Sequence, residues 1–332
     1  MPLQINRRRL ILGGGAAALA GALPRSLLAR TPLSYPKPER ELMVPVRGGR
    51  VYVRINGRLQ GSRLPIILLH GGPGSSHAAL LDALALADER AVILYDQLDS
   101  GRSDHPGDPT NWTVERFTSE LEAIREALGI PRWHVAGHSW GGTIALEYGA
   151  MRPAGLAGLV LASPLVSTRS WIADANALRA RLPAEIRAEL DHCDPPAPVT
   201  PACETATAAF YAQFNQREQP KPAAVAYRRD HSGRGFNARL YETMWGRSEF
   251  VATGTLKDYD GEPLLARLPG ERTLFIVGQY DEARPVTSDA FALRTPNSNF
   301  AVVPGAAHDI FGDRPDETLG ILRPWLRRQD PA

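Results

Sequence analysis

The chain has 332 residues, of which 43% are hydrophobic and 22% charged, and it contains only two cysteines. This length and hydrophobic share allow a large buried core and exclude a disordered chain, while two cysteines exclude a disulfide-dense miniprotein. The formal net charge is +2, from 38 Lys and Arg against 36 Asp and Glu. Four basic residues and no acidic ones fall in residues 1–29, so the remainder carries 34 − 36 = −2. The basic excess is local to the N-terminus and gives no support for a nucleic-acid partner.

Residues 1–29 have the layout of a signal peptide. The arginines Arg7-Arg8-Arg9 precede an apolar, Gly- and Ala-rich run over 10–23, and Ala20-Gly21-Ala22 has the small-x-small form of a cleavage site. The paired arginines resemble a twin-arginine export signal, which implies the export machinery as a partner and a periplasmic or secreted protein. Cleavage after Ala22 or after Ala29 stays open, as do an uncleaved interfacial anchor and a plain basic N-terminus.

From about residue 40, short β-rich runs alternate with helical sequence. We expect strands at 51–55, 65–69, 91–95, 133–136, 158–162, 273–277 and 300–303, and helices at 76–87, 113–128, 141–151 and 319–327. This alternation predicts an α/β fold with a mostly parallel sheet and helices on both faces.

One long stretch interrupts the alternation. Between about 164 and 254 no apolar strand run occurs, and helical segments are expected at 178–190 and 205–214. The prediction is a core in two parts, residues 40–163 and 255–332, with a helical cap of residues 164–254 inserted between them.

The pentapeptide Gly137-His138-Ser139-Trp140-Gly141 matches Gly-x-Ser-x-Gly between an expected strand and an expected helix. This is the context in which the motif forms a nucleophile elbow, because only glycines leave room for the sharp turn that exposes the serine. The pattern predicts Ser139 as a catalytic nucleophile.

A glycine-rich turn, His70-Gly71-Gly72-Pro73-Gly74, follows the expected strand at 65–69. Its unobstructed amides, with that of the residue after the nucleophile, can form an oxyanion hole. We expect the backbone N–H groups of Gly72 and Trp140 there. An ordinary structural turn is the alternative, and the pattern of a phosphate-binding loop is missing.

Hydrolases of this kind place their acid and histidine after the serine in the chain. Of the histidines after Ser139, His192 and His231 fall in the predicted cap, whereas His308 lies just past the last expected strand. Asp281 follows the strand at 273–277 and is the expected partner that orients His308. Glu282 and Asp309 are neighbours that could be confused with them.

Cys193 and Cys203 flank a proline-rich segment of the predicted cap. In an exported protein they could form a disulfide, and two ordinary buried thiols are the alternative. Two cysteines ten residues apart with only His192 beside them make a poor ligand set, so no metal is expected.

Several motifs together resemble the proline iminopeptidase branch of the α/β-hydrolase superfamily. The resemblance runs from about residue 42 to the C-terminus and is carried by His70–Gly74, Tyr95–Gln97, Ser100–Asp104, Gly137–Gly142, Met244–Phe250, Gly254–Asp260 and Gly278–Glu282. It implies a capped α/β core, a Ser-Asp-His triad, no metal or organic cofactor, and release of an N-terminal residue, commonly proline, from short peptides or amides.

The resemblance also implies that carboxylates of the cap hold the free amino group of the substrate. The matching positions are Glu249, within Met244–Phe250, and Glu204, at the start of the helix before Phe210. Trp245 and Arg247 depart from the family pattern beside Glu249, which bears on specificity for proline more than on hydrolysis.

The sequence therefore predicts an exported serine aminopeptidase that acts on small substrates with a free N-terminus. An amino acid amidase or a small-ester esterase with the same triad is the second hypothesis, and a binding module with a dormant triad is the third. A nucleotide-dependent oxidoreductase is excluded because no nucleotide fingerprint follows any expected strand.

Overall fold

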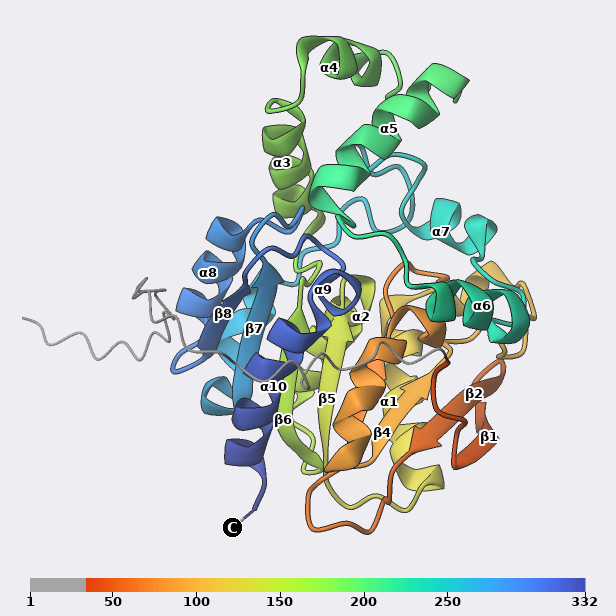
Figure 1. The fold of residues 1–332 in the computed structure, drawn as a ribbon, viewed down its shortest axis with the longest axis vertical. Coiled ribbons are helices and arrows are strands. Elements are labelled where there is room, and N and C mark those ends of the chain that lie inside the picture. Colours follow the sequence, from red (N-terminus) through yellow and green to blue (C-terminus); the bar gives the residue numbers. More distant parts are fainter. Residues whose placement is uncertain (1–33, 332) are drawn as a thin grey trace, which may run out of the picture.

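The computed structural model of the protein describes residues 34–331, so the predicted signal of residues 1–29 lies outside the described residues (Figure 1). The strands are β1 (Arg40–Val46), β2 (Gly49–Asn56), β3 (Ile66–Leu69), β4 (Val92–Tyr95), β5 (Trp133–His138), β6 (Leu156–Ala162), β7 (Thr273–Gly278) and β8 (Asn299–Val303). They form one sheet in the order β1-β2-β4-β3-β5-β6-β7-β8. The run from β4 to β8 is parallel, whereas β1 and β2 are antiparallel to their neighbours, so the predicted mostly parallel α/β sheet is confirmed.

The helices outside the insertion cover both faces of the sheet. They are α1 (Val114–Ala127), α2 (Trp140–Met151), α8 (Pro285–Arg294), α9 (Ile310–Asp313) and α10 (Pro315–Gln329), with short 3₁₀ helices η1 (His77–Ala79), η2 (Leu81–Asp88), η3 (Pro109–Asn111), η4 (Glu262–Arg267) and η5 (Gly270–Arg272). Successive residues of a strand point to opposite faces. Ile67 and Leu69 accordingly join the core cluster that contains residues of α1, α2 and α8. Ile66 and Leu68 join the cluster that contains residues of η2, α9 and α10.

A helical insertion separates β6 from β7. It consists of α3 (Thr168–Arg179), α4 (Ala184–Asp191), α5 (Pro201–Phe214), α6 (Pro222–His231) and α7 (Ala238–Met244). Figure 1 shows these helices gathered at one end of the sheet, with α4 and α5 farthest from it. Part of the insertion has its own small core, in which Phe210 and Phe250 are buried with residues of α3.

Three local expectations differ from the structure. The segment before residue 49, where no strand was expected, includes β1, which pairs with β2 as a hairpin. The expected helix at 76–87 is two 3₁₀ helices. The expected helix at 178–190 is broken at Pro183, because a proline lacks the N–H that a continuous helix needs; α3 ends before it and α4 begins after it. None of the helices in residues 34–331 has the length and apolar character that crossing a bilayer requires.

Candidate active site

Ser139 occupies a strained turn between β5 and α2. Its φ of 57° and ψ of −120° lie outside the helical and strand regions, and its carbonyl accepts hydrogen bonds from the amides of Gly142 (2.8 Å) and Leu165 (3.2 Å). A Cβ at Gly137 would collide with the carbonyl oxygen of Gly141, and a Cβ at Gly141 would collide with that of Leu69. The two glycines of the motif are therefore required for the close approach that presents the Ser139 side chain at the sheet edge.

The glycine-rich loop after β3 lies against Ser139. A Cβ on Gly71 would stand 3.0 Å from the Cβ of Ser139, and Gly72 has a φ of +108°, which favours glycine. Gly72 and Ser139 line the same cavity. Trp140 turns its indole into the core, where Nε1 donates to Oε1 of Gln97 (2.8 Å), and its backbone begins α2. Gly72 on the loop and Trp140 at the N-terminus of α2 are thus both close to Ser139, as the predicted oxyanion hole requires.

Asp281 and His308 follow β7 and β8 and meet at the same edge of the sheet. Nδ1 of His308 bonds Oδ1 of Asp281 at 2.9 Å. The Asp281 carboxylate also accepts from the hydroxyl of Ser163 (2.5 Å) and from the amides of Gly278 (3.0 Å) and Ala283 (2.8 Å). A carboxylate with this many donors is held in one orientation, and it in turn orients the imidazole through Nδ1.

Helix α5 of the insertion holds the loops that carry these residues. The carbonyl of Phe214, at the last position of α5, accepts hydrogen bonds from the amides of Glu282 (3.0 Å) and His308 (3.2 Å). The next carbonyl, of Asn215, accepts from the amide of Asp309 (2.8 Å). The helical insertion and the catalytic loops are thus joined through the main chain.

One cavity of about 210 Å³ brings together the predicted residues Gly72, Ser139, Glu249 and His308. It is lined by Gly71, Gly72, Ser75, Ala79, His138, Ser139, Leu165, Trp171, Asn215, Tyr241, Trp245, Glu249, Glu282, His308 and Asp309. Pockets for drug-sized ligands usually measure about 300–1,000 Å³, so this volume suits a small group.

Glu249 enters the cavity from the loop after α7. Its Oε1 accepts from the hydroxyls of Tyr211 (3.0 Å) and Tyr241 (2.5 Å), and its Oε2 accepts from Nε1 of Trp171 (3.3 Å). Burial and the Glu249 charge raise the pKa of both tyrosines well above its ordinary value, so they stay protonated donors. Trp171 also packs its ring edge-on against His308, with 5.3 Å between ring centroids.

A second carboxylate in this cavity belongs to Glu282, the neighbour that the sequence pattern could confuse with Asp281. It is 2% exposed, and its Oε1 accepts from Nδ2 of Asn215 (2.6 Å). Its Oε2 is buried without a hydrogen-bond partner among the described residues. A buried, unpaired carboxylate oxygen beside a cavity is suited to a cationic ligand.

The pKa of His308 is shifted by burial and by the carboxylates around it. Burial lowers the pKa of His308, but the carboxylates of Asp281 and Glu282 outweigh burial and raise it overall. Oε1 of Glu282 lies 3.8 Å from Nε2 of His308. Burial also raises the pKa of Glu282; the charge of His308 opposes this rise, and the charge of Glu249 adds to it. His138, whose Nε2 donates to the carbonyl of His308 (2.8 Å), has its pKa lowered to about 4 by burial and by the charge of His308.

Several residues that the sequence analysis named do not line the cavity. Glu204 is exposed on the first turn of α5, whereas only the last turn of that helix reaches the site, so the expectation that it faces the substrate does not hold. Arg247 is exposed as well, but Trp245 lines the cavity and is 3% exposed. His192 and His231 are exposed at the ends of α4 and α6.

Cys193 and Cys203 form a disulfide that joins the end of α4 to the first turn of α5. Among the described residues, Glu189, Cys193 and Cys203 bring three potential metal-ligand atoms together. Both sulfurs are engaged in the disulfide, so neither is the thiolate that binds a metal.

The chain is similar in sequence and in structure to known α/β hydrolases. A family model described as alpha/beta hydrolase fold matches residues 65–315. The proline iminopeptidase of Heyndrickxia coagulans is 36% identical over 289 residues, which cover 86% of this chain and 98% of that protein. The crystal structure of a proline iminopeptidase from Mycobacterium smegmatis superposes with a TM-score of 0.77 at 34% identity, over 87% of this chain and 98% of that one. The crystal structure of VinJ superposes with a TM-score of 0.79 at 32% identity, over 88% and 99% of the two chains.

Proposed function

The chain belongs to the proline iminopeptidase branch of the α/β-hydrolase family and is a serine hydrolase of that type, and from this premise we propose that it releases an N-terminal proline or other small residue from short peptides or amides through an acyl-enzyme. The observation that carries the proposal is the position of two carboxylates, Glu249 and Glu282, in the same small cavity as Ser139 and His308. An aminopeptidase must bind a free ammonium group next to the bond that it cleaves, and paired carboxylates do this.

The reaction is assigned to these residues as follows. Nε2 of His308 takes the proton of the Ser139 hydroxyl while Oγ of Ser139 attacks the carbonyl carbon of the N-terminal residue of the substrate. The amides of Gly72 and Trp140 donate to the oxyanion, and Asp281 stabilises the imidazolium. His308 then gives the proton to the leaving amine, and the C–N bond breaks. Water, deprotonated by His308, attacks the acyl-enzyme and frees the amino acid and Ser139.

Glu249 and Glu282 are assigned to the substrate ammonium. Both are polar groups in a cavity whose other walls include Leu165, Trp171 and Trp245. An ammonium placed between them would find acceptors in surroundings with little competing water, and the acyl side chain would lie against the apolar wall. The cavity volume of about 210 Å³ favours a single small residue over an extended peptide on this side of the scissile bond.

A substrate panel tests the proposal. The purified enzyme is assayed with proline arylamide, alanine arylamide, amino acid amides, N-acetylated analogues and simple nitrophenyl esters. We expect kcat/KM for the free-amine arylamides to exceed that for their N-acetylated analogues by about 10²-fold. This is the effect expected when the charged hydrogen bonds between the substrate ammonium and the carboxylates are lost. Equal rates on blocked and free substrates would contradict an aminopeptidase, and a preference for simple esters would favour an esterase with the same triad.

We also propose that the protein is exported with residues 1–29 as a twin-arginine-type signal, and that residues 164–254 form a cap between core parts 40–163 and 255–332. The arginine-led apolar run supports export, and a disulfide fits an oxidising compartment. Fractionation of cells that express the full chain and an Arg7→Lys/Arg8→Lys variant tests the signal. Export should fall in the variant, and equal distribution of the two would contradict the signal.

A further inference from the structure

The Glu249 carboxylate depends on three helices of the insertion. Its hydrogen-bond donors are Trp171 on α3, Tyr211 on α5 and Tyr241 on α7. Glu249 itself stands on a segment outside helices and strands. Its position at the cavity is therefore set by contacts that hold this segment to the surrounding helices.

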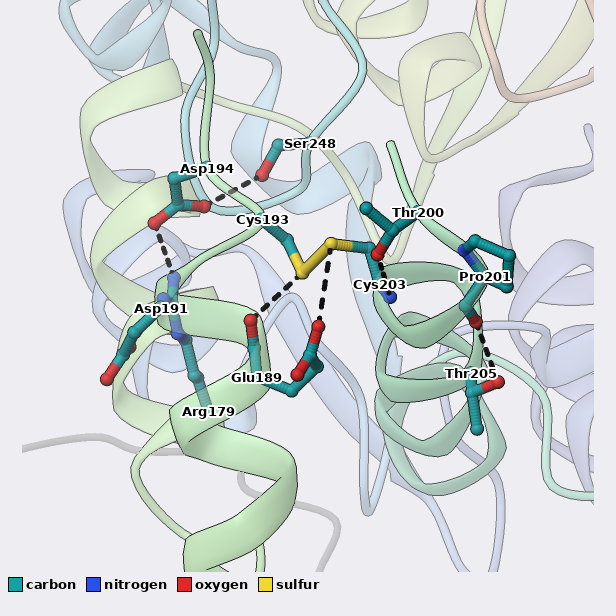
Figure 2. Close-up of a disulfide and its surroundings, with 10 residues drawn as sticks. All are labelled: Arg179, Glu189, Asp191, Cys193, Asp194, Thr200, Pro201, Cys203, Thr205 and Ser248. Atoms are coloured by element: carbon teal, nitrogen blue, oxygen red, sulfur yellow. Dashed lines mark hydrogen bonds and ion pairs between the residues drawn. A yellow bond between two sulfur atoms is a disulfide. The ribbon is translucent and has the colours of Figure 1, made fainter. Parts of the chain in front are cut away.

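A second group of contacts, away from the cavity, holds the residues on either side of Glu249 (Figure 2). Ser248 donates from its hydroxyl to Oδ1 of Asp194 (3.3 Å), and the same hydroxyl accepts from the amide of Phe250 (3.0 Å). Arg179 donates to Oδ2 of Asp194 (2.8 Å), and its guanidinium lies over the Phe250 ring, 4.8 Å from the centroid. Asp194 thus bridges the end of α3 to the segment that carries Glu249.

The disulfide fixes Asp194 in turn. Cys193 directly precedes Asp194 and is bonded to Cys203 on α5, and Figure 2 shows the sulfur–sulfur bond beside the Asp194 contacts. The connection between α4 and α5 consists of residues 192–200, outside regular structure, so the covalent bond sets where Asp194 lies relative to α5. Helix α5 carries Tyr211, which donates to Glu249. The disulfide is therefore connected to Glu249 by two routes. One passes through Asp194 and Ser248, and the other passes along α5 to Tyr211.

We propose that Arg179, Cys193, Asp194, Cys203 and Ser248, here called the cap brace, position Glu249 to receive the ammonium group of the substrate. These are positioning residues, since none of them lines the cavity. Small displacements of a binding group weaken its interaction strongly. Loss of the cap brace should therefore impair recognition of a free amine while leaving acyl transfer by Ser139 intact. This inference rests on the proposed function of Glu249.

The test compares Ser248→Ala, Asp194→Asn and the double variant Cys193→Ser/Cys203→Ser in the purified full chain. Proline arylamide and N-acetylproline nitrophenyl ester serve as free-amine and blocked substrates. We expect KM for the arylamide to rise about 5- to 20-fold with kcat within about twofold, and both constants for the ester to stay within about twofold. Ser248→Thr keeps the hydroxyl and should restore the arylamide KM.

Two controls separate positioning from general stability. Thr205→Ala alters an exposed residue two positions after Cys203 whose hydroxyl donates only within α5, to the carbonyl of Pro201, and it should behave as wild type. In the Glu249→Gln background, Ser248→Ala should have no further effect on the arylamide KM, because residues in one network are not additive. Circular dichroism of each variant verifies folding, and Ser248→Ala alone decides the matter where the cysteine variant fails to fold.

Unchanged arylamide KM in Ser248→Ala and Asp194→Asn would overturn the cap brace, and so would equal losses on both substrates. A wild-type enzyme that does not distinguish the free from the blocked amine would instead contradict the proposed function. The first result is measured in the variants and the second in the wild-type enzyme, so failure of the cap brace is distinguishable from failure of the proposed function.

Discussion

Oε1 of Glu282 lies 3.8 Å from Nε2 of His308, while Asp281 bonds Nδ1 of the same ring at 2.9 Å. The imidazole is therefore flanked by carboxylates at both nitrogens, inside a cavity that also contains Glu249. In the free enzyme this negative charge favours the imidazolium. A substrate ammonium placed between Glu249 and Glu282 would offset the charge and return His308 to its neutral form, so binding and activation of the base are coupled.

The coupling predicts a distinctive pH dependence. A base acts when neutral, so a raised His308 pKa moves the acid limb of kcat/KM above the ordinary histidine value of about 6.5. With a free-amine substrate the acid limb of kcat, which reports the bound state, should lie at lower pH than that of kcat/KM. With an N-blocked ester the two limbs should coincide. Glu282→Gln should shift the ester limb downward, and an unmoved limb would contradict the influence of Glu282.

Ser139→Ala should abolish hydrolysis. Removal of a nucleophile that acts with a histidine base costs about 10⁴-fold or more in kcat. The variant should also lose labelling by a fluorophosphonate probe, and its circular dichroism should match wild type because the Cβ and the strained φ of 57° are retained. Retained labelling or turnover would remove Ser139 from the nucleophile role.

Glu249→Gln and Glu282→Gln should each raise KM for proline arylamide by about 10- to 100-fold, since a hydrogen bond to a charged group is worth about 1.5–3 kcal/mol. The N-acetylated ester should be affected far less. Glu204→Gln is the matched control, because Glu204 is exposed on the same insertion but outside the cavity. A larger effect from Glu204→Gln than from the other two would reverse this assignment.

Asp330, which follows α10, bonds residues at the end of the sheet that lies away from the cavity. It accepts from Arg90 (3.1 Å from each terminal nitrogen) and bonds Nε2 of His134 at 3.0 Å, and both partner side chains are buried. Removal of the Asp330 carboxylate would leave the buried charge of Arg90 without its ion-pair partner. Asp330→Ala should therefore lower the free energy of unfolding by roughly 3 kcal/mol at pH 7. The exposed Arg328→Ala should change it little.

The same residue gives a pH signature in stability. Burial raises the Asp330 pKa, but the hydrogen bonds and charges of His134 and Arg90 outweigh burial and lower it overall. Its contribution is fully present above the unfolded value of about 3.9 and is lost as pH falls below it. The difference in unfolding free energy between wild type and Asp330→Ala, measured with denaturant, should therefore shrink in acid. A constant difference would contradict the ion-pair explanation.

Residues that follow directly after a parallel strand were the ones that the sequence could locate. Ser139, Asp281 and His308 each come within a few residues of a strand end, and parallel strands bring those ends to one edge. Glu204 was misplaced because a carboxylate at a helix start says nothing about which end of the helix meets the core. Glu282 was set aside because its direction depends on the turn after Asp281, which no local pattern encodes. The segment at 77–88 was expected to be helical from its Ala- and Leu-rich composition, and that composition does not distinguish an α-helix from the 3₁₀ helices observed.

Helix α5 has a consequence for how substrates reach Ser139. It has 14 residues (Pro201–Phe214), about 21 Å. Its first turn carries the disulfide at Cys203, and the carbonyl of Phe214 at its other end accepts hydrogen bonds from the amides of Glu282 and His308. A hinged movement of the insertion away from the sheet would break those main-chain hydrogen bonds to the loops that carry Glu282 and His308. We therefore expect this end of the insertion to stay in place while substrate binds, so that the cavity keeps its shape.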